Sequence, residues 1–393
     1  MNNRLKSERR IKILFVNSQM EKGGAQKAML SLASTLSRED FEVTVCTMYD
    51  KENYIEYFEE VYDLKIINLR MKDLVGKSLF TKILAFGKGV LRFKKLARDI
   101  DIVQTYSHTA NIVFPFFAFL FGVKIRVTSQ RMSLDRMSKK IQLSDKLIEN
   151  SFLVTKLTSV SEGTKRSCID IQGIRPEKII TIPNGIDLSR IDSELSLVDR
   201  SSIRNSIGLS DSQVAILTVA RFHKQKGHQY LLDAILELKD DYPEAVFIFV
   251  GHGELEQEIA SFIKGNNLED HVRLLGARND VPAIMNSCDI FILPSLWEGM
   301  PNTVLEAMSV SMPTIATSVD GTPELIIDRS HGVLIPSKNS GAIKQEIEFM
   351  LNNSEFRKSL GVAARKRIED VFSLEKTTKS FADLYKKLML RNG

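Results

Sequence analysis

Residues 11–36 read IKILFVNSQMEKGGAQKAMLSLASTL. The segment begins with a short and almost wholly apolar run, Ile11 to Val16, which is typical of a strand buried on both faces of a parallel sheet. Apolar residues then recur at helical spacing, at Ala25, Ala28, Met29, Leu32 and Leu36. Gly23-Gly24 lies where this helix is expected to begin. The stretch therefore predicts a strand, a glycine-containing turn and a helix.

The second half of the chain opens with the same pattern. Residues 214–238 read VAILTVARFHKQKGHQYLLDAILEL, which predicts a strand, a basic loop with Lys226-Gly227 and a helix. Other short apolar runs predict further strands at 41–48, 100–105, 124–129, 157–160, 178–182, 245–250, 272–275, 289–293, 313–317 and 332–335. Strands that alternate with helices predict doubly wound α/β domains, which bind ligands at the carboxyl ends of their strands.

The length of 393 residues corresponds to two domains of ordinary size, each of roughly 100–200 residues. A polar stretch between Asp187 and Ser202 is expected to separate a domain at 1–190 from a domain at 202–373. A content of 43% hydrophobic and 26% charged residues is that of a folded protein, and it excludes collagen, coiled coil and disorder.

The cysteines and the apolar runs indicate the cellular compartment in which the protein is expected to lie. The three cysteines are odd in number and far apart, which argues against a disulfide framework and a cysteine zinc site. Met1 to Arg10 is polar, and the longest apolar run, Ile112 to Val123, is shorter than the ~20 residues of a spanning helix. The sequence therefore predicts an intracellular protein that is neither secreted nor transmembrane.

Positive charge is concentrated in the first half of the chain. Residues 1–190 carry 32 basic and 21 acidic residues, a net +11, whereas residues 191–393 carry 22 and 28, a net −6. Between Lys65 and Arg98, ten basic residues face a single acid, Asp73. This excess favours an anionic ligand or surface. It is a weak indication of nucleic-acid binding, because no recognised binding module surrounds it.

Residues 77–95 have the pattern of a basic amphipathic helix. Its apolar face is formed by Phe80, Ile83, Leu84, Gly87, Val90 and Leu91, and its basic positions are Lys77, Lys82, Lys88, Arg92 and Lys95, although Lys94 falls on the apolar side. Such a helix either lies on an anionic membrane surface or packs on its own domain. The nearby phenylalanines allow the same two interpretations; they are Phe114, Phe116, Phe117, Phe119 and Phe121.

Residues 294–308 read PSLWEGMPNTVLEAM and follow the predicted strand at 289–293. Pro301 fits the first turn of a helix, and a helix N-terminus attracts anions through its N–H groups and its partial positive charge. Glu298 precedes this helix and Glu306 lies inside it, so the two carboxylates can accept hydrogen bonds from separate hydroxyls of one ligand. The competing interpretation is solvated surface charge.

Arg221 and Lys226 follow the strand at 214–220 and emerge at the same sheet edge. An arginine suits bidentate phosphate contact and a lysine adds a mobile charge, although a basic surface loop would look the same. Gly251-His-Gly-Glu begins like a dinucleotide fingerprint but has Glu256 at its last position, which argues against nicotinamide binding. His223, His228 and His252 are not at metal-ligand spacing with any carboxylate, so no metal site is expected.

Five segments together resemble glycosyltransferase family 4. They are GGAQ at 23–26, VSEG at 160–163, IPNGID at 182–187, Arg221 with Lys226-Gly227, and PSLWEGMPNTVLEAM at 294–308. The resemblance spans nearly the whole chain in the expected order. It implies a GT-B fold, with two Rossmann-like domains facing across a cleft, the first for the acceptor and the second for a nucleotide-sugar. It also implies retention of anomeric configuration without a metal, and a final helix at 374–390 that packs back on the first domain.

The resemblance also implies roles for single residues. Arg221 and Lys226 would hold the donor diphosphate in place of a metal, Glu306 the ribose and Glu298 the transferred sugar. The other donor-binding positions implied are Gly23, Gly24, Gly299, Met300, Pro301, Asn302 and Thr303.

In the first domain, His108 is the expected contact to the sugar, although relatives often carry histidine at the positions of Gln104 or Tyr106, or one residue after His108. Arg131, in Thr128-Ser-Gln-Arg131, would contact an acceptor phosphate.

The sequence thus leads to a retaining glycosyltransferase that passes a hexosyl or N-acetylhexosaminyl group from a UDP-linked donor to a glycan or polyprenyl-diphosphate-linked acceptor. Its expected setting is surface polysaccharide synthesis, in the cytoplasm or at the inner face of the cytoplasmic membrane, with no cofactor. The alternatives are another GT-B enzyme, such as a phosphorylase or nucleotide-sugar epimerase, and a non-catalytic subunit that binds a nucleotide-sugar.

Overall fold

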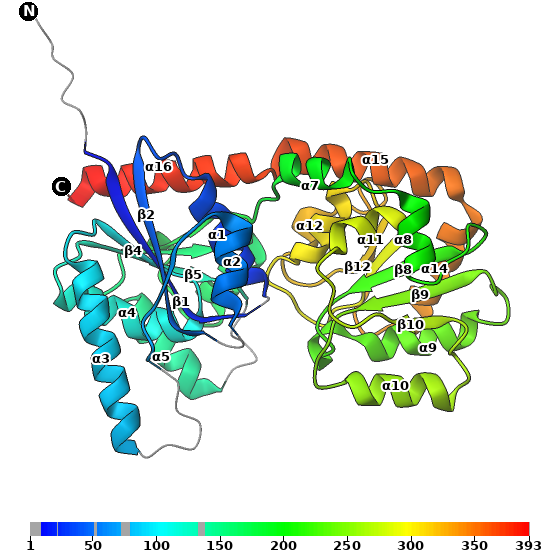
Figure 1. Ribbon diagram of the computed structural model, residues 1–393, viewed down its shortest axis with the longest axis horizontal. Helices are drawn as coiled ribbons and strands as arrows, with labels where there is room; N and C mark the ends of the chain where they lie inside the picture. Colours follow the sequence, from blue (N-terminus) through cyan, green and yellow to red (C-terminus); the bar gives the residue numbers. More distant parts are fainter. Residues whose placement is uncertain (1–8, 22, 51–52, 72–78, 133–137, 393) are drawn as a thin grey trace, which may run out of the picture. The chain divides into compact units, whose positions relative to one another are not determined.

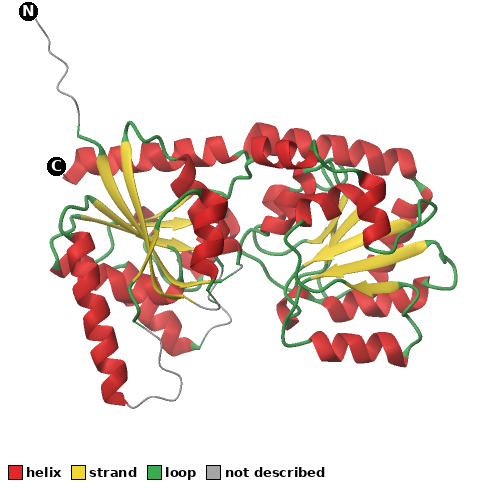
Figure 2. Ribbon diagram, in the orientation of Figure 1, coloured by secondary structure: helices red, strands yellow, loops and turns green. Residues whose placement is uncertain are grey.

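The computed structural model describes residues 9–21, 23–50, 53–71, 79–132 and 138–392 and divides into two compact units. The first unit consists of Met1–Gly185 and Leu374–Gly393, and the second of Ile186–Ser373. In each unit one parallel sheet lies between helices (Figures 1 and 2). This is the predicted GT-B fold class, with two Rossmann-like domains, and that prediction is confirmed.

The first unit contains a seven-stranded sheet in the order β3-β2-β1-β4-β5-β6-β7. Its strands are β1 (Ile11–Met20), β2 (Phe41–Asp50), β3 (Ile66–Asn68), β4 (Ile102–Thr105), β5 (Ile125–Gln130), β6 (Lys156–Ser159) and β7 (Ile179–Thr181). Its helices are α1 (Gly24–Thr35), α2 (Tyr54–Tyr62), α3 (Leu79–Ala97), α4 (His108–Leu120), α5 (Lys139–Glu149), α6 (Glu162–Asp170) and α16 (Leu374–Asn392).

The second unit contains a six-stranded sheet in the order β10-β9-β8-β11-β12-β13. Its strands are β8 (Val214–Val219), β9 (Ala245–Val250), β10 (Val272–Leu274), β11 (Ile290–Leu293), β12 (Thr314–Thr317) and β13 (Val333–Ile335). Its helices are α7 (Leu188–Leu195), α8 (Arg200–Ser206), α9 (His228–Leu238), α10 (Glu256–Gly265), α11 (Val281–Ser287), α12 (Asn302–Ser309), α13 (Thr322–Leu325), α14 (Ser340–Asn352) and α15 (Ser354–Val371).

The apolar run of β1 supplies two separate cores. Ile13 and Phe15 pack with α1 and α16 on one face of the sheet, whereas Leu14 and Val16 pack with α3 and α4 on the other. Successive side chains of a strand point to opposite faces, so a central strand needs apolar residues at every position. Burying each large side chain stabilises the fold by roughly 1.5–3 kcal/mol.

The chain passes from the first unit to the second directly after Gly185 and returns at Leu374. This first junction lies five residues before the expected domain end at residue 190, because α7 packs in the second unit, where Arg365 of α15 binds Asp192. The returning helix α16 packs against α1, and the Tyr385 hydroxyl donates to Gln104 Oε1 at 2.5 Å in the first core.

No helix among the described residues is both long and apolar enough to cross a bilayer.

Candidate active site

The strand order of the second sheet reverses between β8 and β11, which are neighbours. Doubly wound sheets bind ligands outside the carboxyl ends of the two strands at such a switch point. The loop after β8 carries Arg221 and Lys226, and the loop after β11 carries Glu298 and leads into α12. Arg221, Lys226 and Glu298 therefore come from the two loops that the topology favours.

Backbone contacts join these two loops closely. The N–H of Leu296 donates to the Gln225 carbonyl at 2.7 Å, and the Gln225 side-chain amide donates to the Trp297 carbonyl at 2.8 Å. Gly227 has a φ of 66°, and a Cβ atom there would lie 2.1 Å from the Pro294 carbonyl oxygen. Only glycine fits this approach, so Gly227 fixes the loop that carries Lys226.

Lys226 and Glu298 form the central contact of the site. Lys226 Nζ donates to Glu298 Oε1 at 2.5 Å, and the Ser295 hydroxyl donates to the same oxygen at 2.7 Å. The N–H of Glu298 donates to Asp320 Oδ2 at 2.7 Å. The two charged side chains are only 19% and 7% exposed, so each depends on the other for compensation of its charge.

The helix start beside this pair has the features of an anion site. Helix α12 begins at Asn302 after Pro301, without a side-chain hydrogen bond at its N-cap and without an acidic residue in its first turn. The partial positive charge of the helix end therefore has no acidic side chain in that turn to oppose it. Met300 is buried, so it can serve a ligand through its backbone, whereas Glu306 is partly exposed on α12.

Arg221 lies two residues after the end of β8 and is exposed, on the same loop as Lys226. Gly251 and Gly253, which follow β9, are explained by close backbone packing rather than by dinucleotide binding. A Cβ atom at Gly251 would lie 2.0 Å from the Ala220 carbonyl oxygen, and one at Gly253 would lie 2.4 Å from that of Phe222. These glycines therefore let the loop after β9 pack against the loop that begins with Arg221.

The first sheet has its own switch point, between β1 and β4. Helix α1 begins at Gly24 with Gly23 as its N-cap, and helix α4 begins at His108. His108 Nδ1 lies 3.4 Å from Asp145 Oδ1 of α5. The three first-unit positions that the sequence indicated at 23, 24 and 108 thus follow the two strands of this switch point, whereas Arg221, Lys226 and Glu298 belong to the second unit.

Two buried acids near His108 were missed by the sequence analysis. Asp145 and Glu149 lie one turn apart on α5 and are 1% and 0% exposed. Glu149 Oε2 accepts a hydrogen bond from the Thr128 hydroxyl at 2.6 Å. Burial, and secondarily the neighbouring Asp145, raises the pKa of Glu149 well above its ordinary value. Burial therefore favours the protonated form of this carboxyl.

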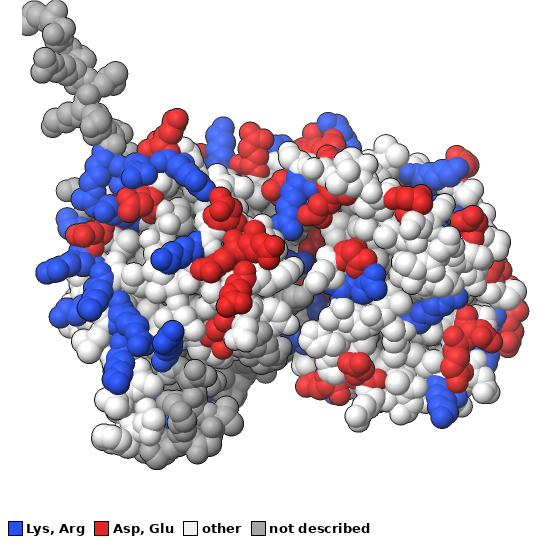
Figure 3. All heavy atoms as spheres, in the orientation of Figure 1, with Lys and Arg blue, Asp and Glu red and all other residues white. Residues whose placement is uncertain are grey.

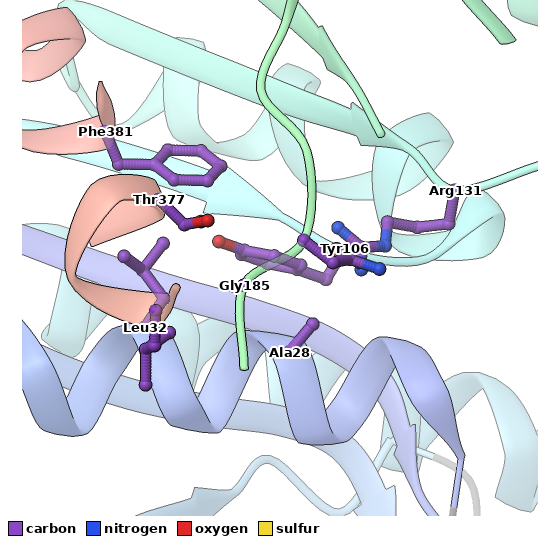
Figure 4. Close-up of a pocket in the computed structure, with 9 residues that line it drawn as sticks. Ala28, Leu32, Tyr106, Arg131, Gly185, Thr377 and Phe381 are labelled. Atoms are coloured by element: carbon purple, nitrogen blue, oxygen red, sulfur yellow. The ribbon is translucent and has the colours of Figure 1, made fainter. Parts of the chain in front are cut away.

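Arg131 lines a small pocket of the first unit together with residues of α1 and α16 (Figure 4). Its guanidinium donates to Asn184 Oδ1 at 2.6 Å and lies 5.9 Å from the centre of the Tyr106 ring. Burial lowers the pKa of Arg131 to about 10, so the side chain stays charged at neutral pH. Gln104 is fully buried against Tyr385 and is unavailable to a ligand.

Among the described residues, no group of three His, Cys, Asp or Glu side chains is arranged to hold a metal ion. His228 packs against the rings of Phe222 and Phe249, and burial lowers its pKa to about 4.

Residues 22–190 match the family model described as Glycosyltransferase Family 4, and residues 199–367 match the model described as Glycosyl transferases group 1. An uncharacterised glycosyltransferase of Methanocaldococcus jannaschii is 32% identical over 320 residues, which cover 74% of this chain and 78% of the relative. The chain belongs to glycosyltransferase family 4. The predicted resemblance is confirmed.

Other relatives of this family 4 glycosyltransferase have named activities. The Escherichia coli UDP-Gal:alpha-D-GlcNAc-diphosphoundecaprenol alpha-1,3-galactosyltransferase is 29% identical over 302 residues, 75% of this chain and 77% of that protein. A Campylobacter jejuni N-acetylgalactosaminyltransferase named for a diphospho-undecaprenol-linked substrate is 28% identical over 364 residues, 90% and 93% of the two chains. HepE of Anabaena, solved in complex with UDP-glucose, has the same fold, with a TM-score of 0.83, 21% identity, and coverage of 96% and 100%.

Proposed function

We propose that this glycosyltransferase transfers a hexosyl or N-acetylhexosaminyl group, with retention of configuration, from a UDP-linked donor to a lipid-linked glycan. The observation that carries the proposal is the Lys226–Glu298 pair beside the start of α12, at the switch point of the second sheet. The E. coli and C. jejuni relatives support the acceptor class, and the UDP-glucose complex of HepE supports the donor class.

The donor chemistry assigns one task to each group. As the glycosidic bond breaks, negative charge grows on the diphosphate and positive charge grows on the sugar ring. Arg221 and Lys226 stabilise the diphosphate, and Glu298 stabilises the sugar. Backbone groups of residues 299–303 hold the phosphate and sugar, and Glu306 holds the ribose. Ser295 and Asp320 fix Glu298 before the reaction, and a group fixed in this way stabilises developing charge at little reorganisation cost.

The acceptor is assigned to the first unit. His108, held near Asp145, contacts the transferred sugar, and Arg131 binds a phosphate of the lipid-linked acceptor. A lipid-linked acceptor places the enzyme at the inner face of the cytoplasmic membrane, in the synthesis of surface polysaccharide. The reaction needs no metal, because Arg221 and Lys226 supply the positive charge.

The test is incubation of the purified chain with UDP-, GDP- and ADP-sugars and a polyprenyl-diphosphate-linked acceptor, followed by detection of the released nucleotide. We expect release of UDP, and a product whose anomeric configuration by NMR equals that of the donor. A product of opposite configuration would refute retention. Binding of a nucleotide-sugar without turnover on any acceptor would instead favour a non-catalytic subunit.

A further inference from the structure

Three neighbouring helices of the first unit, α3, α4 and α5, present large apolar side chains to solvent. The strongly exposed members are Phe80 (76%), Ile83 (63%), Leu91 (61%), Leu120 (59%), Leu143 (57%) and Leu147 (63%). Phe116, Phe119 and Phe152, which follows α5, are exposed as well. Single exposed apolar residues are common on soluble proteins, but a contiguous apolar patch marks an interaction site.

The orientation of α5 shows that this exposure is built into the fold. Leu143 and Leu147 lie one turn apart and face solvent, whereas Asp145 and Glu149 lie one turn apart and are buried. An ordinary surface helix has the opposite arrangement, with leucines inside and acids outside. The bond from Thr128 to Glu149 and the contact of Asp145 with His108 fix the acids inside and hold the leucines outside.

Aromatic contacts link α4 to α3 and to Phe152 within this region. Helix α4 packs against both α3 and α5. The rings of Phe86 of α3 and Phe117 of α4 have centroids 6.0 Å apart, and those of Phe119 of α4 and Phe152 have centroids 5.1 Å apart. We call this region, formed by α3, α4, α5 and Phe152, the α3–α5 surface.

The charge of the α3–α5 surface is entirely positive. Helix α3 contains no acid and carries Lys82, Lys88, Arg92, Lys94 and Lys95. Helix α5 adds Lys139, Lys140 and Lys146, and its two acids are the buried ones. Figure 3 shows Lys and Arg side chains along the side of the first unit where Figure 1 draws α3.

We propose that the α3–α5 surface binds a phospholipid bilayer with anionic headgroups. A bilayer interface takes up aromatic and aliphatic side chains and, at the same depth, attracts lysine and arginine to lipid phosphates, so it matches both properties of the surface. The sequence indicated the α3 part of it and the phenylalanines of α4; the α5 part comes from the structure. The inference rests on the proposed function for its biological setting, because a lipid-linked acceptor lies in a bilayer, but binding is measurable without turnover.

The experiment is sedimentation of the full chain with vesicles of phosphatidylcholine alone and of phosphatidylcholine with phosphatidylglycerol. We expect co-sedimentation with the anionic vesicles at low salt and less at high salt, since salt screens exposed charges. Removing Lys88 or Lys95 by substitution with Ser should lower the vesicle affinity about fivefold for each charge. The double substitution Leu143→Gln and Leu147→Gln should lower the vesicle affinity at least about tenfold, since each substitution removes an apolar side chain that the bilayer would bury.

Matched controls come from the second unit, where Leu197 and Val362 are 88% and 69% exposed. Leu197→Gln and Val362→Gln should leave vesicle affinity unchanged, and every variant should show the same rise in melting temperature with UDP as the wild type. Wild-type protein that stays in the supernatant with anionic vesicles at low salt, or loss of binding in the control variants to the same extent, would overturn the proposal. Vesicle binding without any turnover would refute the proposed function and leave this inference standing.

Discussion

Replacement of Glu298 by glutamine is expected to tighten UDP binding and to lower turnover at the same time. In the structure Lys226 Nζ donates to Glu298 Oε1 at 2.5 Å, so the cation proposed for the diphosphate is held by a carboxylate. The donor must draw Lys226 at least partly away from that carboxylate. Glutamine has the same length and still accepts from the Ser295 hydroxyl, but it carries no charge to hold Lys226.

The size of the expected gain in UDP affinity follows from the geometry of the Lys226–Glu298 pair. Coupling energies between contacting groups run from ~0.5 to ~3 kcal/mol. Lys226 retains 19% exposure, and the glutamine oxygen still accepts from it, so we expect about 1–2 kcal/mol, which is a 5- to 30-fold gain in UDP affinity. Loss of the carboxylate that we propose faces the cationic sugar should raise the barrier by about 2–4 kcal/mol, which is roughly a 30- to 900-fold loss in kcat.

The assay combines calorimetric titration with UDP and steady-state kinetics at saturating donor, on variants shown to be folded by circular dichroism. Glu306→Gln is the control, and it should change UDP affinity in the opposite direction. Loss of the proposed ribose contact should weaken UDP binding and leave kcat unchanged. If Glu298→Gln weakens UDP binding, the carboxylate does not compete for Lys226. If it keeps wild-type kcat, the carboxylate does not face the sugar.

Three further outcomes are expected. Arg221→Ala should lower kcat about 30- to 900-fold and weaken UDP binding by less, because the diphosphate gains charge in the transition state; equal losses in both would contradict this. Turnover should persist in EDTA, and activity that is abolished by chelator and restored by Mg²⁺ would refute the metal-free mechanism. Glu149→Gln should remove a pH dependence of stability. The unfolded carboxyl ionises near its ordinary value of 4.5, whereas the buried one keeps its proton to higher pH, so the wild-type free energy of unfolding falls relative to the variant as pH rises above that value. The slope is up to ~1.4 kcal/mol per pH unit until the folded pKa is passed. Denaturant titrations between about pH 5 and 8 measure it, and a difference that stays constant would show that Glu149 is ionised in the fold.

The sequence predicted those helices and strands whose residue pattern lies within one short stretch of the chain. The central strands are apolar at nearly every position because they are covered on both faces, as the two cores on either side of β1 show. Once β8 and β11 were recognised, Arg221, Lys226 and Glu298 followed as residues of the loops after them. Strand β3 (Ile66–Asn68) was missed.

The features that sequence reasoning missed depend on contacts between distant segments. Asp320 anchors the backbone of Glu298 from a loop 22 residues away, and a single aspartate after β12 carries no pattern of its own. Helix α5 is the sharper case. The spacing of Leu143 and Leu147 indicates an apolar face without saying where it points, and the default is inward. The contacts of Asp145 and Glu149 with α4 and β5 reverse that default.

The placement of charge separates the two kinds of anion binding that we propose for this molecule. The second half has a net charge of −6 and nevertheless contains the proposed donor site, so phosphate binding there would depend on a few fixed groups. Lys226 is largely buried against Glu298, and salt screens such a pair weakly. The surplus of +11 in the first half is concentrated on exposed side chains such as those of α3, which salt screens strongly. Raising the salt concentration should therefore release the enzyme from anionic vesicles at concentrations that leave UDP binding nearly unchanged, and a parallel loss of both would mean that one electrostatic surface serves both ligands.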